Sequence, residues 1–303
     1  MLKANALRGS IVALITPLRK EKVDLSGLVK NLRFQLKNKT FGFVPCGTTG
    51  EAPTLTEEEW EAVIATTVKT VAKKAPVIAG AGTNCTRKTI GLVKRAKELG
   101  ADAVLLVAPY YNKPTQEGLY RHFRSICDNV DIPVVIYNIP GRTGVNILPR
   151  TLARLVEDCS NIIGVKEASG NLDQIAEVIA RCGERISVLS GDDSLTLPIL
   201  SIGGRGVISV IANIVPKDLA TMIEYYFKGK IEKANKLNKK LFALAKAMFV
   251  ETNPIPIKTA MNLLGMPAGD LRLPLCEPSA ESFAIIKKAL IDYGFAISSR
   301  GKD

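Results

Sequence analysis

Histidine is almost absent from this chain of 303 residues, since His122 is the single example. Zinc sites built on two or three histidines, the H-E-x-x-H helix of metalloproteases and the two-histidine triads of non-haem iron enzymes are therefore excluded. A Ser-His-Asp triad would have to use His122. That residue lies in the segment LYRHFRSICD, which has the pattern of a helix. We therefore expect a partly exposed helical residue without a catalytic role.

Paired cysteines and long apolar runs are also missing. The six cysteines lie at least 23 positions apart and form no C-x-x-C motif, which is typical of reduced thiols in a cytoplasmic protein. No apolar run approaches the ~18 residues of a membrane-spanning helix, so we expect no membrane association. The apolar stretch 11–18 contains Pro17 and lacks a signal-peptide cleavage site, so we interpret it as a first core strand.

Acidic residues are fewer than basic ones, with 29 Asp and Glu against 41 Lys and Arg, which gives a net charge of +12. The basic residues are spread over most of the chain. Their densest cluster, 228–246, is interleaved with apolar residues at helical spacing, which indicates the solvated face of an amphipathic helix. Interleaved aromatic residues for base stacking are missing, so we expect no nucleic-acid partner.

Short apolar runs rich in β-branched residues recur at regular intervals along the chain. Several are continuous rather than alternating, as in VLLVA and PVVIY, which is typical of parallel strands covered on both faces. We expect eight strands, at 10–15, 42–45, 77–79, 103–107, 134–137, 162–166, 186–190 and 206–210.

Helical patterns separate these runs. Thr56 and Glu59 form a capping box, and Pro149 and Pro216 suit the first turns of helices. The strand–helix alternation predicts an α/β fold, a (β/α)8 TIM barrel, over residues 1–228, with a C-terminal helical extension over 229–303. The G-x-G-x-x-G of a Rossmann fold and the G-x-x-x-x-G-K-[ST] of a P-loop are absent.

The active site of such a barrel lies at the carboxyl ends of its strands. The turn 47–51, with the sequence GTTGE, follows the second expected strand and offers hydroxyl and amide donors to a small carboxylate. Its alternative interpretation is an ordinary glycine-rich turn. Tyr137 ends the fifth expected strand, and Arg142 follows it. The planar guanidinium group of Arg142 can bind a carboxylate through two parallel hydrogen bonds.

Lys166 ends the sixth expected strand, directly after an apolar run. A desolvated lysine has a lowered pKa, and its free amine is a nucleophile toward carbonyl groups. Alternatively, a strand-end lysine reaches solvent. The joint placement of lysine, tyrosine, hydroxyl and arginine side chains at one rim favours Schiff-base chemistry. Because an iminium is its own electron sink, we expect no metal ion and no cofactor.

Seven segments in order resemble the dihydrodipicolinate synthase family, and the resemblance covers almost the whole chain. These segments are 47–51, 137–144, 164–171, 191–193, 203–213, 251–258 and 271–274. The resemblance implies a class I aldolase-type condensation of pyruvate with L-aspartate 4-semialdehyde, through an imine on Lys166, in lysine and diaminopimelate biosynthesis.

The resemblance also implies a proton relay. Tyr137 would be the proton donor and acceptor near the imine, and Thr48 would connect it to Tyr111 of a neighbouring subunit. Sharing a tyrosine in this way implies at least a homodimer, and many family members are tetramers formed by two such dimers.

The substrate contacts follow from the same resemblance. Thr49 would bind the carboxylate of pyruvate, and Arg142 would hold the carboxylate of the semialdehyde. Gly191 and the carbonyl group of Ile208 would complete the wall beside Lys166.

Some family members are inhibited by lysine at a pocket between subunits. Here that pocket would include Glu57, Asn84 and Tyr110, but Lys88 stands where sensitive bacterial enzymes have a carboxylate. A like charge beside an incoming ammonium group is unfavourable, so we expect weak or no inhibition by lysine.

Two other functions remain open at this point. N-acetylneuraminate lyase and the 2-keto-3-deoxy sugar acid aldolases share the lysine, the tyrosine and a similar turn, but they generally lack an arginine at position 142. A non-catalytic barrel acting as a basic binding protein would form no imine with pyruvate and would bind nucleic acid in a salt-sensitive manner.

Overall fold

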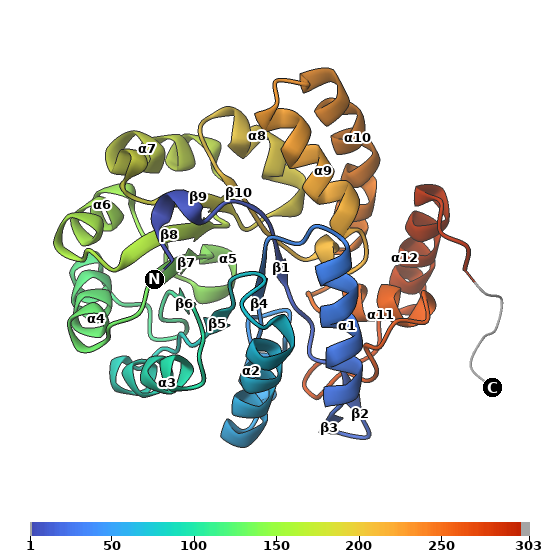
Figure 1. Cartoon of the computed structure of the whole chain (residues 1–303), viewed down its shortest axis with the longest axis horizontal. Helices are drawn as coiled ribbons and strands as arrows, with labels where there is room; N and C mark the ends of the chain where they lie inside the picture. The colour runs from blue at the N-terminus through green and yellow to red at the C-terminus, as the bar shows by residue number, and fades with distance from the viewer. Residues whose placement is uncertain (1, 298–303) are drawn as a thin grey trace.

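Eight parallel strands form a barrel in the computed structural model, which describes residues 2–297 (Figure 1). Their order is β4-β1-β10-β9-β8-β7-β6-β5, and a parallel bridge between Phe43 and Val77 joins the two end strands. The strands are β1 (Gly9–Ala13), β4 (Gly42–Val44), β5 (Ile78–Gly80), β6 (Ala103–Val107), β7 (Val134–Asn138), β8 (Ile162–Glu167), β9 (Ser187–Ser190) and β10 (Gly206–Ser209). The predicted TIM barrel is confirmed, and each strand lies within two residues of its expected position.

Helices surround the strands (Figure 1). They are α1 (Leu25–Lys37), α2 (Glu57–Val71), α3 (Thr86–Glu98), α4 (Gln116–Asn129), α6 (Pro149–Asp158), α7 (Leu172–Cys182), α8 (Thr196–Ser201) and α9 (Pro216–Phe227), and the short α5 (Pro140–Thr143) follows β7. The capping box of α2 is confirmed, because the Glu59 amide donates to the Thr56 hydroxyl and the Thr56 amide donates to the Glu59 carboxylate. Pro149 and Pro216 open their helices as expected.

Each strand is buried on both faces, which explains the continuous apolar runs. On β1, for example, Ile11 belongs to the cluster that fills the barrel, whereas Val12 belongs to the larger cluster between strands and helices. Lys166 is a buried polar exception on β8. The two apolar layers make the strands a rigid support for the side chains at their ends.

His122 lies on α4, as predicted, but the expectation of partial exposure is wrong. Its side chain is 7% exposed and packs on the apolar face of the helix beside Phe123. The ring Nδ1 lies 2.9 Å from the hydroxyl of Thr86 at the start of α3. Burial lowers the pKa of His122 to about 4, so the ring is neutral and structural.

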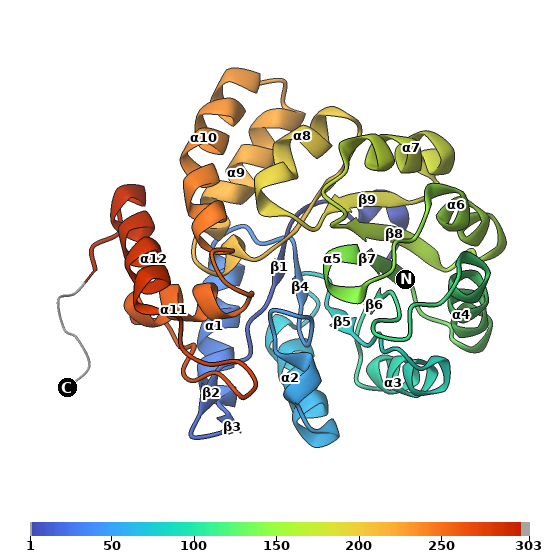
Figure 2. The ribbon, with the colours of Figure 1, turned by 180° about the vertical axis from the view of Figure 1, so that it is seen from behind.

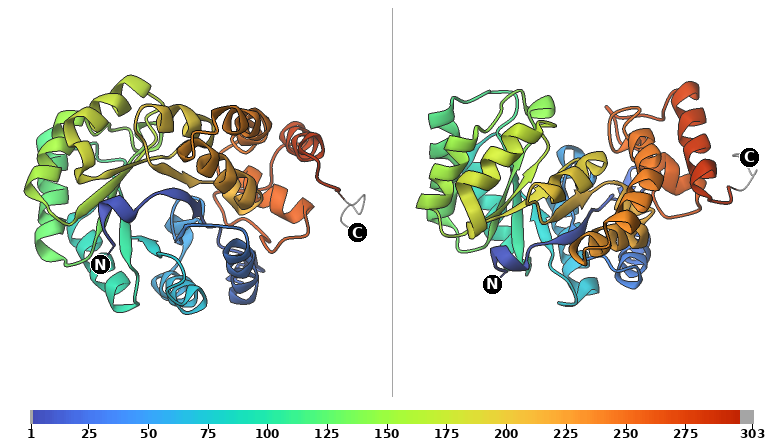
Figure 3. Two further views of the ribbon diagram at one scale, coloured as in Figure 1. Left: turned by 45° about the horizontal axis from the view of Figure 1, so that its top comes forward. Right: turned by 90° about the horizontal axis from the view of Figure 1, so that it is seen from above.

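Three helices follow the barrel, namely α10 (Ile231–Ala247), α11 (Ile255–Leu263) and α12 (Ala280–Tyr293). They lie together on one side of it, with α10 against α9 and α12 against both α10 and α11 (Figures 2 and 3). Ala234, Leu241 and Leu244 of α10 face inward, and its lysines are mostly exposed. A boundary between residues 228 and 229 stays a prediction. Over residues 2–297, no helix combines the length and apolar character needed to cross a bilayer.

Candidate active site

Lys166 and Tyr137 lie at paired positions of the neighbouring strands β8 and β7. Paired residues of adjacent parallel strands point to the same face, and here that face is the interior of the barrel. The Lys166 Nζ atom lies 4.2 Å from the centre of the Tyr137 ring. Both side chains are about 5% exposed, so the interpretation of Lys166 as a lysine that reaches solvent is wrong.

Burial changes the acidity of both groups. Burial, helped by the positive charge of Arg142 and opposed by the negative charge of Asp193, lowers the pKa of Lys166 to about 8. Burial raises the pKa of Tyr137 to about 12, against the effects of Arg142 and a hydrogen bond with Thr48. Burial therefore increases the share of free amine on Lys166 near neutral pH and keeps the Tyr137 phenol protonated, so an amine that can act as a nucleophile lies beside a phenol that can donate a proton.

The turn that follows β4 holds two threonines at the rim. Its backbone is closed by hydrogen bonds from the Gly50 amide to the Gly47 carbonyl group and from the Glu51 amide to the Thr48 carbonyl group. Thr49 is buried. This arrangement fixes the two hydroxyl groups at the carboxyl end of the barrel, where the sequence predicts a carboxylate site.

Asn253, which the sequence interpretation did not single out, connects two predicted site residues. Its side-chain amide donates to the Thr49 hydroxyl over 3.0 Å, and its main-chain carbonyl group accepts from the Arg142 guanidinium, also over 3.0 Å. The segment 251–258 belongs to the family resemblance, but no pattern within it indicates that Asn253 contacts the site. It is supplied by the segment between α10 and α11.

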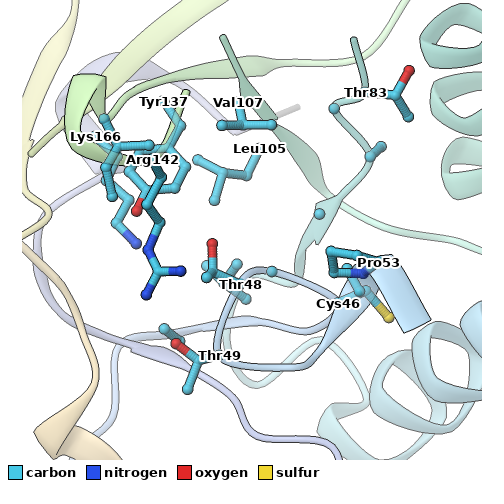
Figure 4. A pocket seen from close by; sticks show the side chains of 18 of the residues that line it. Cys46, Thr48, Thr49, Pro53, Thr83, Leu105, Val107, Tyr137, Arg142 and Lys166 are labelled. Carbon is cyan, nitrogen blue, oxygen red and sulfur yellow. The ribbon is translucent and has the colours of Figure 1, made fainter. Parts of the chain in front are cut away.

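A cavity of about 320 Å³ opens beside Lys166. Five of the eight predicted site residues line it and gather around it in Figure 4, namely Thr48, Thr49, Tyr137, Arg142 and Lys166. The cavity size suits a small organic acid, and the Arg142 guanidinium and the threonine hydroxyls provide donors for carboxylates.

The other three predicted residues lie outside the lining of this cavity in residues 2–297. Gly191 nevertheless contacts Lys166, since a Cβ atom added to Gly191 would lie 3.1 Å from the lysine Cε. Ile208 is buried inside the barrel on β10. Tyr111 is 88% exposed and has a positive φ of 72°, while its neighbour Tyr110 lines the cavity.

A second cavity, of about 430 Å³, lies outside the barrel between α2 and α3. Its lining includes Glu57, Trp60, Lys88 and Arg95. Lys88 is exposed, whereas Arg95 is paired with Glu61. The predicted lysine pocket and this cavity thus share Glu57 and Lys88.

The chain is similar to known proteins over most of its length. The model of the "Dihydrodipicolinate synthetase family" matches residues 6–292. A 4-hydroxy-tetrahydrodipicolinate synthase of Methanocaldococcus jannaschii is 52% identical over 287 residues, which cover 95% of this chain and 99% of the relative. Another, of Thermodesulfovibrio yellowstonii, is 55% identical over 272 residues, which cover 90% and 93%.

Solved structures agree with these relatives. The dihydrodipicolinate synthase of Aquifex aeolicus is 47% identical, with a TM-score of 0.94 over 97% of this chain and 100% of that chain. The chloride-inhibited dihydrodipicolinate synthase of Acinetobacter baumannii, complexed with pyruvate, is 42% identical, with a TM-score of 0.93 over 95% and 99%. The chain therefore belongs to the dihydrodipicolinate synthetase family.

Proposed function

We propose that this chain condenses pyruvate with L-aspartate 4-semialdehyde in lysine and diaminopimelate biosynthesis, and that Lys166 carries the reaction as a Schiff base. The observation on which this proposal rests is the buried Lys166 amine against Tyr137 at the wall of a small cavity. Family membership and the pyruvate complex of the Acinetobacter baumannii relative support the same substrate.

The chemistry begins at the free amine of Lys166. Its Nζ attacks the keto carbon of pyruvate, and loss of water gives an iminium. The iminium withdraws electrons, so a proton leaves the methyl group and an enamine forms. The enamine carbon attacks the aldehyde of the second substrate, whose oxygen takes up a proton. The amino group of that substrate then attacks the imine carbon, which closes the ring and releases Lys166.

The surrounding side chains serve this sequence of steps. Tyr137 is protonated at neutral pH and exchanges protons beside the imine, with Thr48 connecting it to Tyr111 of a second subunit. Thr49 binds the carboxylate of pyruvate at the buried end of the turn, and Arg142 binds the carboxylate of the semialdehyde.

Two further residues complete the wall next to the amine. Gly191 leaves the space that the lysine side chain occupies, and the carbonyl group of Ile208, on β10, completes the wall beside Lys166. A side chain at position 191 would press on Lys166.

Borohydride trapping tests the mechanism. The protein is incubated with pyruvate, reduced, digested and mapped by peptide mass spectrometry. We expect one reduced adduct, on Lys166, and none in a Lys166→Ala variant. The other buried lysine, Lys258, lies in the same digest and is the internal control. Absence of an adduct on Lys166 would falsify the mechanism.

Consumption of L-aspartate 4-semialdehyde, but not of a sugar aldehyde, distinguishes this enzyme from sugar-acid aldolases.

The active unit is a homo-oligomer of at least two subunits, with a tetramer of two dimers as the expected form. The exposure of Tyr111 outside its own cavity supports this assignment. Mixing Tyr111→Phe with Lys166→Ala should restore part of the lost activity, because one site of a hybrid dimer contains both native residues. Hybrids verified by native mass spectrometry without recovered activity would contradict the shared tyrosine.

Lysine is expected to inhibit this enzyme weakly or not at all. The ammonium group of Lys88 at the second cavity supports this expectation, because it repels the amine of an incoming lysine. Isothermal titration that detects micromolar lysine binding would contradict it.

We place the enzyme in the cytoplasm, where its six free cysteines remain reduced, and cell fractionation tests that location.

A further inference from the structure

The ion pair between Glu51 and Lys258 is buried far more deeply than any other in residues 2–297. The Lys258 Nζ lies 2.6 Å from the Glu51 Oε1, and the two side chains expose 1% and 0% of their surfaces. In the other pairs of these residues, both side chains expose at least 14%. Removing two charges from water costs about as much as their attraction returns, so stability alone does not account for such a pair.

The partners of this pair come from four separate segments. Besides Glu51, the Lys258 ammonium donates to the carbonyl groups of Thr16 and Asp270, so its three N–H groups have three acceptors. The second carboxylate oxygen of Glu51 accepts from the Arg272 amide over 3.0 Å. The pair thereby joins the segment after β1, the turn after β4, helix α11 and the loop after α11.

Glu51 also fixes the backbone of the turn that carries the threonines. Its φ of 54° is in the left-handed region, where a residue with a Cβ atom stays only if its surroundings hold it. Its amide donates to the Thr48 carbonyl group, and the Thr16 hydroxyl donates to the Gly50 carbonyl group over 2.7 Å. The position of Glu51 therefore determines where Thr48 and Thr49 lie.

The segment that leads into α11 also contacts the turn itself. Asn253, two residues before α11, donates to the Thr49 hydroxyl, whereas Lys258 within α11 holds Glu51. One short stretch of the C-terminal extension thus contacts the 47–51 turn at both Thr49 and Glu51. This geometry connects the extension directly to the carboxylate-binding end of the cavity.

We propose that Glu51 and Lys258 are positioning residues. Their ion pair holds the 47–51 turn in the position where it binds the carboxylate of pyruvate with the keto carbon next to the Lys166 amine. This inference rests on the proposed function. It assigns to the C-terminal extension a part in substrate binding.

The test measures the apparent affinity for pyruvate from the fraction of Lys166 trapped by borohydride at increasing pyruvate concentration. Lys258→Met leaves a buried carboxylate unpaired, and it should lower both the melting temperature and the pyruvate affinity, the latter by about tenfold. The double variant Glu51→Gln with Lys258→Met contains no unpaired charge. It should regain thermal stability while its pyruvate affinity stays at least about threefold below that of the wild type.

Ile286→Ala is the matched control, since Ile286 is a buried residue of α12 in the same extension. It should lower the melting temperature without changing the pyruvate affinity. A double variant with wild-type affinity would overturn the proposal, because a merely structural pair would behave like the control. If Lys258→Met does not fold, the double variant decides alone. A wild-type protein without any pyruvate adduct would instead contradict the proposed function itself.

Discussion

The Lys166 amine lies 4.2 Å from the ring centre of Tyr137, with both side chains buried on adjacent strands. Removal from water disfavours the charged form of each group, so the pKa of the lysine falls to about 8 and that of the tyrosine rises to about 12. One environment thus raises the share of free amine on the lysine near neutral pH and keeps the tyrosine protonated, as the proposed roles of nucleophile and proton donor require. The lowered pKa of Lys166 affects both imine formation and the stability of the fold.

The first prediction concerns the pH dependence of imine formation. The rate of formation should rise with pH through about 8, well below the ~10.4 of an ordinary lysine, because only the free amine attacks pyruvate. The negative charge of Asp193 raises the pKa of Lys166, so Asp193→Asn should move the inflection to lower pH. Stopped-flow measurement of imine formation with pyruvate gives the pH profiles of the wild type and of Asp193→Asn. Asp131→Asn, at an exposed surface pair, is the control. An inflection that stays in place or moves upward would contradict this account.

The second prediction concerns stability. A lysine whose pKa is lowered by folding costs stability at any pH below its folded value of about 8, and the cost disappears as the pH rises through 10.5, the ordinary pKa of a lysine. Lys166→Met should therefore raise the free energy of unfolding at pH 7, by at most about 3 kcal/mol. The gain should vanish above the pKa of an exposed lysine. Urea unfolding of the wild type and of Lys166→Met, at pH 7 and at a pH above 10.5, measures this gain. An unchanged or lower stability of the variant at pH 7 would refute the prediction.

The fold and most of the site could be predicted because their signals are local in the sequence. Continuous apolar runs mark strands buried on both faces, and a residue at the end of such a run lies at the rim of the barrel. Lys166 and Tyr137 are identified in this way. The family resemblance then added Thr48 and Thr49 as specific residues within a turn that composition alone could not distinguish from an ordinary one.

Contacts between distant segments could not be predicted from the sequence. Asn253 and Thr49 are separated by 204 positions, and Lys258 and Glu51 by 207. No periodicity or spacing connects residues so far apart, since only the packing of the C-terminal extension brings them together. The hydrogen bond between Thr86 and His122 is a smaller example, because it joins α3 to α4 across 36 positions.

Gly191→Ala tests how closely the wall fits the lysine. The added Cβ atom would lie 2.7 Å from the Cβ of Ala168 and 3.1 Å from the Cε of Lys166, so the wall must shift and the lysine side chain is pressed out of its place. A displacement of even about 1 Å costs on the order of 100-fold in rate, and we expect kcat to fall by about that factor. Gly91→Ala on α3 is the matched control, since nothing lies within 4 Å of its added Cβ atom. Steady-state kinetics with equal loss of activity in both variants would contradict the prediction.

Asn253→Ala should affect the two substrates unequally. It removes the side-chain amide that donates to the Thr49 hydroxyl, but it keeps the main-chain carbonyl group that accepts from Arg142. Loss of one hydrogen bond of this kind costs about 1 kcal/mol, so the KM for pyruvate should rise several-fold while the KM for the aldehyde changes little. A double-mutant cycle with Thr49→Val provides the control, because removal of both partners should cost less than the sum of the single changes. Additive effects, or an equal rise of both KM values, would show that Asn253 does not act through Thr49.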